Sequence, residues 1–105
     1  MSASNLLVHI LETNYLIGTN YKDWLRNFKI ILILKKLSHI LDQDPIVLPN
    51  HHTTEQRVAF EKWMDEDSQV KCYVLTFMSN ELQSQHEYMP TVRAMITHVQ
   101  ELYGE

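Results

Sequence analysis

Apolar residues recur every three or four positions along much of the chain, which is the period of helices that bury one face. A short run near the start, with Leu6, Leu7, Ile10 and Leu11, predicts a helix over residues 4–13. The same spacing predicts further helices over about residues 21–41, 54–79, 80–88 and 91–103. The pattern therefore favours an all-α fold, a compact bundle of about five helices in a single domain spanning residues 1–105.

Polar residues mark the expected starts of three of these helices. Asn20 and Asp23 have the spacing of a capping box, in which two side chains satisfy the first backbone N–H groups of a helix. Thr53 and Gln56 have the same spacing, and Thr91 stands where it can cap the last helix. We therefore expect helices to begin directly after Asn20, Thr53 and Thr91.

Two stretches do not fit a single regular helix with certainty. Residues 42–52 contain Pro45 and Pro49 and show no helical period, so they predict a long loop. Residues 54–79 fit one long helix or two helices joined near Asp67–Ser68. The acidic cluster Asp65–Asp67 is where we expect any break, and such a charge run is typical of a solvated face.

Aromatic side chains on the apolar faces are the expected core. They are Trp24, Phe28, Trp63, Phe77 and Tyr103. Cys72 lies on an apolar helical stretch, where a lone cysteine is most often a small buried hydrophobe. The helix over residues 21–41 is apolar over more than one stripe, so it is either central to the fold or pressed against a partner.

The composition is that of a globular protein. Hydrophobic residues make up 45% and charged residues 21%, and the two glycines and three prolines are too few for a fold of many short strands. The longest apolar run, Ile30 to Leu34, is far shorter than the ~20 residues that a membrane span needs. With one cysteine no internal disulfide can form. We expect a cytoplasmic protein that does not enter membranes.

The sequence carries no motif for catalysis or metal binding. It has no glycine-rich phosphate loop and no serine–histidine–aspartate signature, so we expect neither an enzyme nor a cofactor. A reactive Cys72 beside a histidine is the catalytic alternative. The six histidines lack the spacing of zinc ligands and are expected on the surface or in loops: His9, His39, His51, His52, His86 and His98.

Charge is distributed unevenly along the chain. Residues 1–41 carry five basic and two acidic residues, a net +3, whereas residues 42–105 carry four basic and eleven acidic residues, a net −7. The formal net charge of −4 argues against a general nucleic-acid binder. The basic residues of the helix over residues 21–41 are weak candidates for RNA phosphate contacts, the alternative being an ordinary polar face. They are Lys22, Arg26, Lys29, Lys35 and Lys36.

The pattern Leu16-x-Gly18-x-Asn20-Tyr21-x-x-Trp24 opens a series of short motifs. It continues as NYKDWLRN over residues 20–27 and is followed by FEKWM at 60–64, KCYVL at 71–75, MSNELQ at 78–83 and QELYGE at 100–105. In this order the motifs resemble the N-terminal capsid-like region of the Gag polyprotein of copia-type LTR retrotransposons of plants. The resemblance covers nearly the whole chain, and the order of the motifs is more specific than any one of them.

This resemblance implies a retroviral-capsid-like structural module that self-associates into virus-like particles enclosing retrotransposon RNA. Its implied partners are other copies of itself and other Gag segments. Gag of this family continues into a zinc knuckle that binds RNA, and with Cys72 as its only cysteine this chain lacks the knuckle. An RNA-binding helical module and a host protein-interaction domain derived from Gag are the alternatives.

Contacts between copies are expected where apolar residues exceed what one helix face needs. The candidates are Leu6, Leu7, Ile10, Leu11, Ile30 and Ile33. The alternative is that these residues close the core of the monomer.

Overall fold

The computed structural model describes residue 9 and residues 15–104. This part of the chain is all-α, as predicted, and comprises α2 (Tyr21–Leu34), the 3-10 helix η1 (Ser38–Leu41), α3 (Thr54–Thr76), α4 (Asn80–His86) and α5 (Val92–Tyr103). The predicted helix over residues 4–13, with four of the candidate contact residues, lies outside the described residues apart from His9. None of the described helices is long and apolar enough to cross a membrane.

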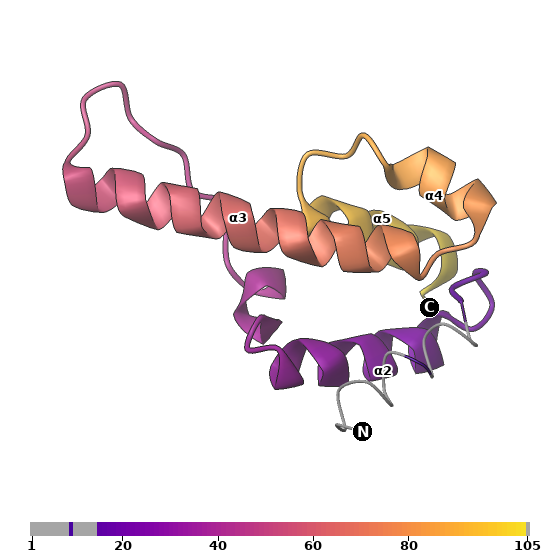
Figure 1. Ribbon diagram of the computed structural model, residues 1–105. Coiled ribbons are helices and arrows are strands. Elements are labelled where there is room, and N and C mark those ends of the chain that lie inside the picture. The colour runs from indigo at the N-terminus through magenta and orange to yellow at the C-terminus, as the bar shows by residue number, and fades with distance from the viewer. Residues whose placement is uncertain (1–8, 10–14, 105) are drawn as a thin grey trace.

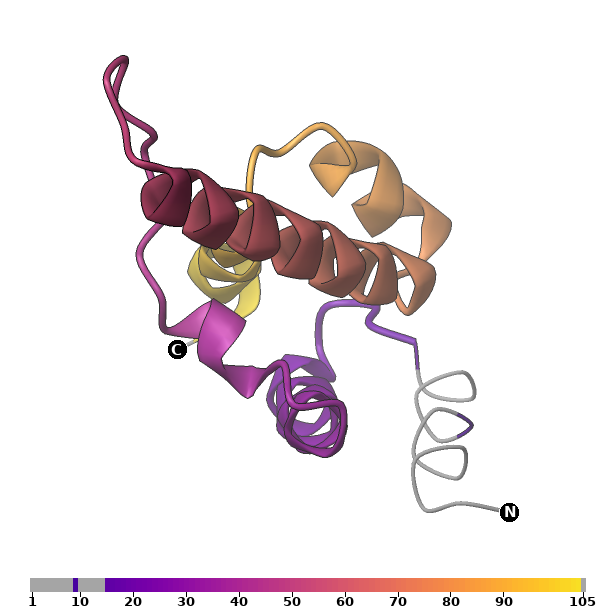
Figure 2. The ribbon, with the colours of Figure 1, turned by 60° about the vertical axis from the view of Figure 1, so that its left-hand side comes forward.

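The helices are arranged around α3, the longest of them (Figures 1 and 2). Both α5 and η1 pack against α3 on one side and against α2 on the other, so they form a middle layer between these two helices. The short helix α4 contacts α3 near the C-terminal end of α3 (Figure 1). The first half of α3 extends past the other helices (Figure 1).

Helix α2 ends earlier than the apolar pattern predicts. The predicted helix over residues 21–41 stops at Leu34, because Lys36 takes a left-handed conformation with φ of 60°. The N–H of Lys36 donates to the carbonyl of Ile33 at 3.1 Å, and the N–H of Leu37 donates to that of Leu32 at 2.8 Å. This is a Schellman motif, and the side chains of Leu32 and Leu37 on either side of the turn are both buried.

Helix α3 begins as predicted but runs without a break. Thr53 and Gln56 form a complete capping box, with bonds of 3.1 Å and 2.8 Å between side chains and backbone N–H groups. The helix continues through Asp67–Ser68 and ends at Thr76, so the break considered at the acidic cluster does not occur. The predicted end at residue 79 is wrong by three residues, because Phe77 to Ser79 turn away toward α4.

The last two helices begin at N-caps and are shorter than predicted by one or two residues. The Ser79 hydroxyl accepts from the N–H of Leu82 at the start of α4, and the Thr91 hydroxyl accepts from the N–H of Ala94 at 3.1 Å at the start of α5. Thr91 thus caps α5 as predicted.

The segment before α2 is tied to the end of α3. Leu16 and Met78 form a parallel bridge, in which the N–H of Leu16 donates to the carbonyl of Phe77 and its own carbonyl accepts from Ser79, both at 2.9 Å. The predicted capping box of Asn20 with Asp23 does not form. The Asn20 side chain instead folds back on the preceding turn.

The turn that Asn20 closes runs over residues 15–20. The side-chain oxygen of Asn20 accepts a hydrogen bond from the N–H of Ile17 at 3.0 Å, and the side-chain amide nitrogen of Asn20 donates to the carbonyl of Tyr15 at 2.8 Å. Gly18 lies in this turn with φ of 116°, and a Cβ there would lie 2.7 Å from the Tyr103 ring. Glycine is therefore required on two grounds.

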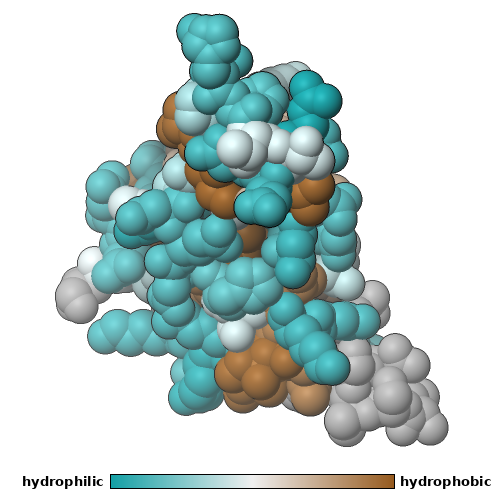
Figure 3. All heavy atoms as spheres, turned by 90° about the vertical axis from the view of Figure 1, so that its left-hand side faces the viewer, coloured by the Kyte–Doolittle hydropathy of each residue, from teal (hydrophilic) through white to brown (hydrophobic). Residues whose placement is uncertain are grey.

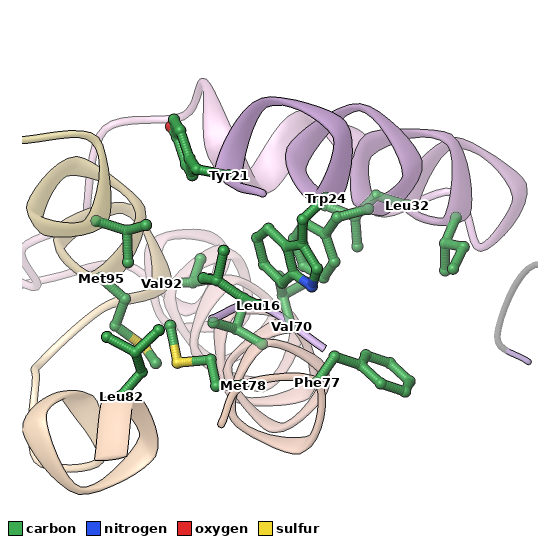
Figure 4. Close-up of a cluster of buried hydrophobic side chains, with 14 of the residues drawn as sticks. Leu16, Tyr21, Trp24, Leu32, Val70, Phe77, Met78, Leu82, Val92 and Met95 are labelled. Carbon is green, nitrogen blue, oxygen red and sulfur yellow. The ribbon is translucent and has the colours of Figure 1, made fainter. Parts of the chain in front are cut away.

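The hydrophobic core fills the space between α2, α3 and α5. Trp24 and Leu32 point from α2 toward Leu16 and Val70 (Figure 4). The Trp24 ring stacks on Phe28, with ring centroids 4.9 Å apart. Each fully buried side chain of this kind stabilises the fold by roughly 1.5–3 kcal/mol. The remaining buried apolar residues are Tyr21, Ile31, Leu37, Ile40, Val74, Phe77, Met78, Leu82, Val92, Met95 and Val99.

Three of the predicted core residues, Trp24, Phe28 and Phe77, are buried. The prediction is wrong for Tyr103, which remains 37% exposed because its ring lies over Gly18 at the edge of the fold. Trp63 is half-buried and packs only partly against the core. Cys72 was expected in the core and is exposed instead.

Candidate interaction surface

The outer face of α2 is defined here as Arg26, Lys29, Ile30 and Ile33. The inner face of the helix is occupied by core residues at a spacing of three and four, from Tyr21 to Ile31. Residues 26, 29, 30 and 33 fall on the opposite side of a helix with 3.6 residues per turn. All four are exposed.

Two isoleucines of this face present large apolar side chains to solvent. Ile30 is 40% exposed and Ile33 is 62% exposed, and the neighbouring Leu34 is exposed as well. Figure 3 shows an apolar patch at the foot of the molecule, where α2 lies. These residues do not close the core of the monomer, so the alternative considered from the sequence does not hold for Ile30 and Ile33.

The basic candidates separate into two groups. Lys22, Arg26 and Lys29 are exposed and share the row that leads to Ile33. Lys35 and Lys36 are also exposed but lie beyond the end of α2, in the turn that closes the helix. The exposed basic residues of α2 therefore lie on the same surface of the helix as the exposed isoleucines. The five basic candidates do not form a single stripe.

Arg26 is the only member of the outer face with an ion pair among the described residues. Its guanidinium lies 3.2 Å from the carboxylate of Asp23, and both side chains are largely exposed. Such pairs contribute little to stability, about 0–1 kcal/mol. Within the described part of the chain Lys29 has no acidic partner.

A second exposed surface, which the sequence did not predict, lies on the first half of α3. We call residues 54–66 the α3 arm, because none of them is buried and this half of the helix extends past its neighbours (Figure 1). Its outer face consists of Arg57, Val58, Glu61, Met64 and Asp65, all exposed. Val58 is 59% exposed and Met64 is 48% exposed.

The inner side of the α3 arm also carries apolar residues. Phe60 and Trp63 are half-buried, and their rings lie 6.3 Å apart in a stacked arrangement. They continue the stripe of Val70 and Val74, which is buried farther along the same helix. The apolar stripe of α3 is therefore longer than the core that covers it.

The prediction that the histidines lie on the surface or in loops is wrong for His86. His86 is fully buried, and its Nδ1 lies 2.7 Å from the carbonyl oxygen of Leu82. Its Nε2 lies 2.8 Å from Nδ1 of His98, on α5. His39 pairs with Glu66 at 3.1 Å, which joins η1 to α3.

Metal binding and nucleophilic catalysis require clusters of side chains. No group of three or more histidine, cysteine, aspartate or glutamate side chains among the described residues could hold a metal ion. Cys72 is exposed on α3, and the hydrogen bonds of His39, His52, His86 and His98 go to other groups. The surfaces of α2 and the α3 arm carry exposed apolar side chains beside charged ones.

No protein-family model, curated protein or solved structure matches this chain.

Proposed function

We propose that this chain is a capsid-type Gag module with a structural role, in which copies associate and build particles that enclose retrotransposon RNA. The observation that carries the proposal is the outer face of α2. Ile30 and Ile33 are exposed side by side on a helix whose other face is already filled by core contacts. Contiguous patches of exposed apolar side chains, unlike single exposed ones, are typical of contacts with other proteins. No catalytic step is part of this proposal.

The order of the sequence motifs supports the Gag assignment, but the first motif has its own structural explanation. Gly18 provides a positive φ in the turn, Asn20 closes that turn, and Trp24 fills the core. The fold therefore accounts for these three residues of the motif. The functional argument depends on the surfaces that such a fold leaves exposed.

The proposal is tested by measuring molar mass with light scattering after size exclusion, from about 10 μM to about 1 mM protein, a range set by the weak association that small interfaces give. We expect the mass to rise with concentration. High salt should preserve or strengthen the apolar part of the contact. A chain that stays monomeric throughout, and that forms no particles as part of a longer Gag polyprotein, would refute the proposal.

RNA binding is the second candidate function, favoured by the exposed row of Lys22, Arg26 and Lys29. A contact of this kind neutralises phosphates, so the logarithm of the affinity for single-stranded RNA should fall with the logarithm of salt concentration by about 0.7 per phosphate. Fluorescence anisotropy with a labelled single-stranded RNA at several salt concentrations measures this slope. Undetectable or salt-independent binding would remove this candidate.

A further inference from the structure

The outer faces of α2 and of the α3 arm are complementary in composition. The first presents Ile30 and Ile33 beside two basic residues, and the second presents Val58 and Met64 beside the acidic Glu61 and Asp65 and the basic Arg57. Each surface therefore offers an apolar centre with charged neighbours, and the net charges of the two surfaces are opposite.

The charged residues of the two faces are partly unpaired within the monomer. In the described part of the chain, neither Lys29 nor Glu61 takes part in a salt bridge. Asp65 accepts a hydrogen bond from Gln69 at 2.9 Å and keeps its negative charge on the same face. Lys29 and Glu61 can consequently form an ion pair with another molecule at little cost to the monomer.

The two surfaces also match in length. Helix α2 has 14 residues, which gives about 21 Å, and the arm over residues 54–66 gives about 20 Å at 1.5 Å per residue. Two helical segments of similar length can pack along their whole extent.

These surfaces do not meet within one copy of the chain. The inner face of α2, with Trp24 and Phe28, points toward the core and the α3 side of the molecule, so its outer face points away from α3. The α3 arm extends beyond the body at the opposite layer (Figure 1). Only a second molecule can bring the two faces together.

We infer that the outer face of α2 in one copy docks on the α3 arm of a second copy, in a head-to-tail contact. This inference rests on the proposed self-association and specifies the surfaces that produce it. A contact between two different patches leaves one unused α2 face and one unused arm on every dimer. It therefore propagates into rings or open chains.

The test uses two double variants that remove apolar surface without changing charge. Ile30→Gln with Ile33→Gln disables the α2 face, and Val58→Gln with Met64→Gln disables the arm. Glutamine is a good helix former, so both variants should keep their helices. The matched control is Tyr88→Gln with Leu102→Gln, two exposed apolar residues outside both faces.

The inference predicts that each double variant alone stays monomeric at concentrations where the wild-type chain and the control associate. An equimolar mixture of the two variants should form a 1:1 dimer and stop there, because it contains one intact face and one intact arm per pair. Each double variant removes two apolar side chains that the contact would bury, which should weaken the contact by at least about tenfold. Sedimentation velocity distinguishes the dimer from monomer and from longer chains, and circular dichroism confirms that the variants are folded.

Other outcomes separate this inference from the proposed function. If the wild type associates and the arm variant alone associates equally well, the head-to-tail contact is wrong while self-association stands. The same conclusion follows if the variants do not pair in the mixture. If the wild-type chain never associates, both the proposed function and the inference fail.

Discussion

The carboxylate of Asp67 on α3 accepts a hydrogen bond from the backbone N–H of Val92, the first residue of α5, at 3.0 Å. Asp67 is 6% exposed, so this contact is shielded from water. One turn later on α3, the ammonium group of Lys71 donates to the carbonyl of Met89 at 2.8 Å. Two charged side chains on one face of α3 therefore hold the connection between α4 and α5.

Replacing Asp67 should destabilise the protein. The carboxylate satisfies one of the backbone N–H groups that a helix start leaves unpaired, and its charge lies at the positive end of the α5 dipole. We expect Asp67→Ala to lower the free energy of unfolding by about 1–3 kcal/mol, measured by urea denaturation followed by circular dichroism. Asp65→Ala on the exposed side of the same helix should cost no more than about 0.5 kcal/mol. Equal effects of the two changes would show that the contact does not stabilise the fold.

Local features of the chain predicted the starts of the helices well. The capping residues Thr53 and Thr91 act on N–H groups three positions away, so their role can be deduced from neighbouring residues. The end of α2 could not be deduced in this way. Its left-handed residue is Lys36 and not the usual glycine, and the apolar period continues through the turn to the buried Leu37 and Ile40.

Contacts between distant residues account for the remaining errors. Asp67 belongs to an acidic run and meets its partner 25 residues later, so only the fold reveals that it is buried. The α3 arm was missed for a similar reason. Phe60 and Trp63 keep the period of the core residues, and their incomplete burial arises because the other helices do not cover the start of α3.

The hydrogen-bonded pair of His86 and His98 should have one defined tautomer. A carbonyl oxygen can only accept, so Nδ1 of His86 must carry the proton that bonds to Leu82. In the neutral ring Nε2 is then an acceptor, and Nδ1 of His98 must donate to it. Nitrogen chemical shifts of the imidazole rings, measured by NMR, should identify the Nδ1–H form of His86. The Nε2–H form would contradict this arrangement.

Removing the donor of this pair should cost stability. His98→Ala leaves Nε2 of the fully buried His86 without the donor that the fold supplies, which should lower the free energy of unfolding by about 1–3 kcal/mol. His52→Ala is the control, because His52 bonds to the carbonyl of Pro49 in the loop before α3. A change no larger than that of the control would mean that the His86–His98 bond does not stabilise the core.

Alkaline pH should weaken the fold through Tyr21. Burial raises the pKa of the Tyr21 hydroxyl above its ordinary value of 10.0. Above about pH 10 the unfolded chain releases a proton that the folded chain retains, so the free energy of unfolding falls as pH rises through this range. Urea denaturation between about pH 8 and about pH 11 should show this fall.

Tyr21→Phe should remove the contribution of this group to the alkaline loss. At neutral pH the same change should be neutral or slightly stabilising, because no described group accepts a hydrogen bond from the buried hydroxyl. Tyr88→Phe, at a position that is 90% exposed, should leave the pH dependence unchanged. An alkaline loss that is identical in the wild type and in Tyr21→Phe would assign it to other groups.

Charge reversal tests the electrostatic part of the proposed contact between copies. Lys29→Glu or Glu61→Lys alone should weaken self-association several-fold, because an exposed ion pair between the copies contributes up to about 1 kcal/mol and each change replaces it by repulsion. Combining both changes in one chain restores opposite charges across the contact and should recover most of the association. Lys29→Glu combined with Glu87→Lys should give no recovery, because Glu87 follows α4 and lies outside the α3 arm.

The differences in self-association between these variants should shrink in high salt, where exposed charges are screened. Light scattering on the four variants measures self-association and should show recovery only for Lys29→Glu combined with Glu61→Lys. A phosphate-binding role for Lys29 predicts instead that every variant with Lys29→Glu loses RNA affinity and that Glu61→Lys does not restore it, which fluorescence anisotropy with labelled RNA measures.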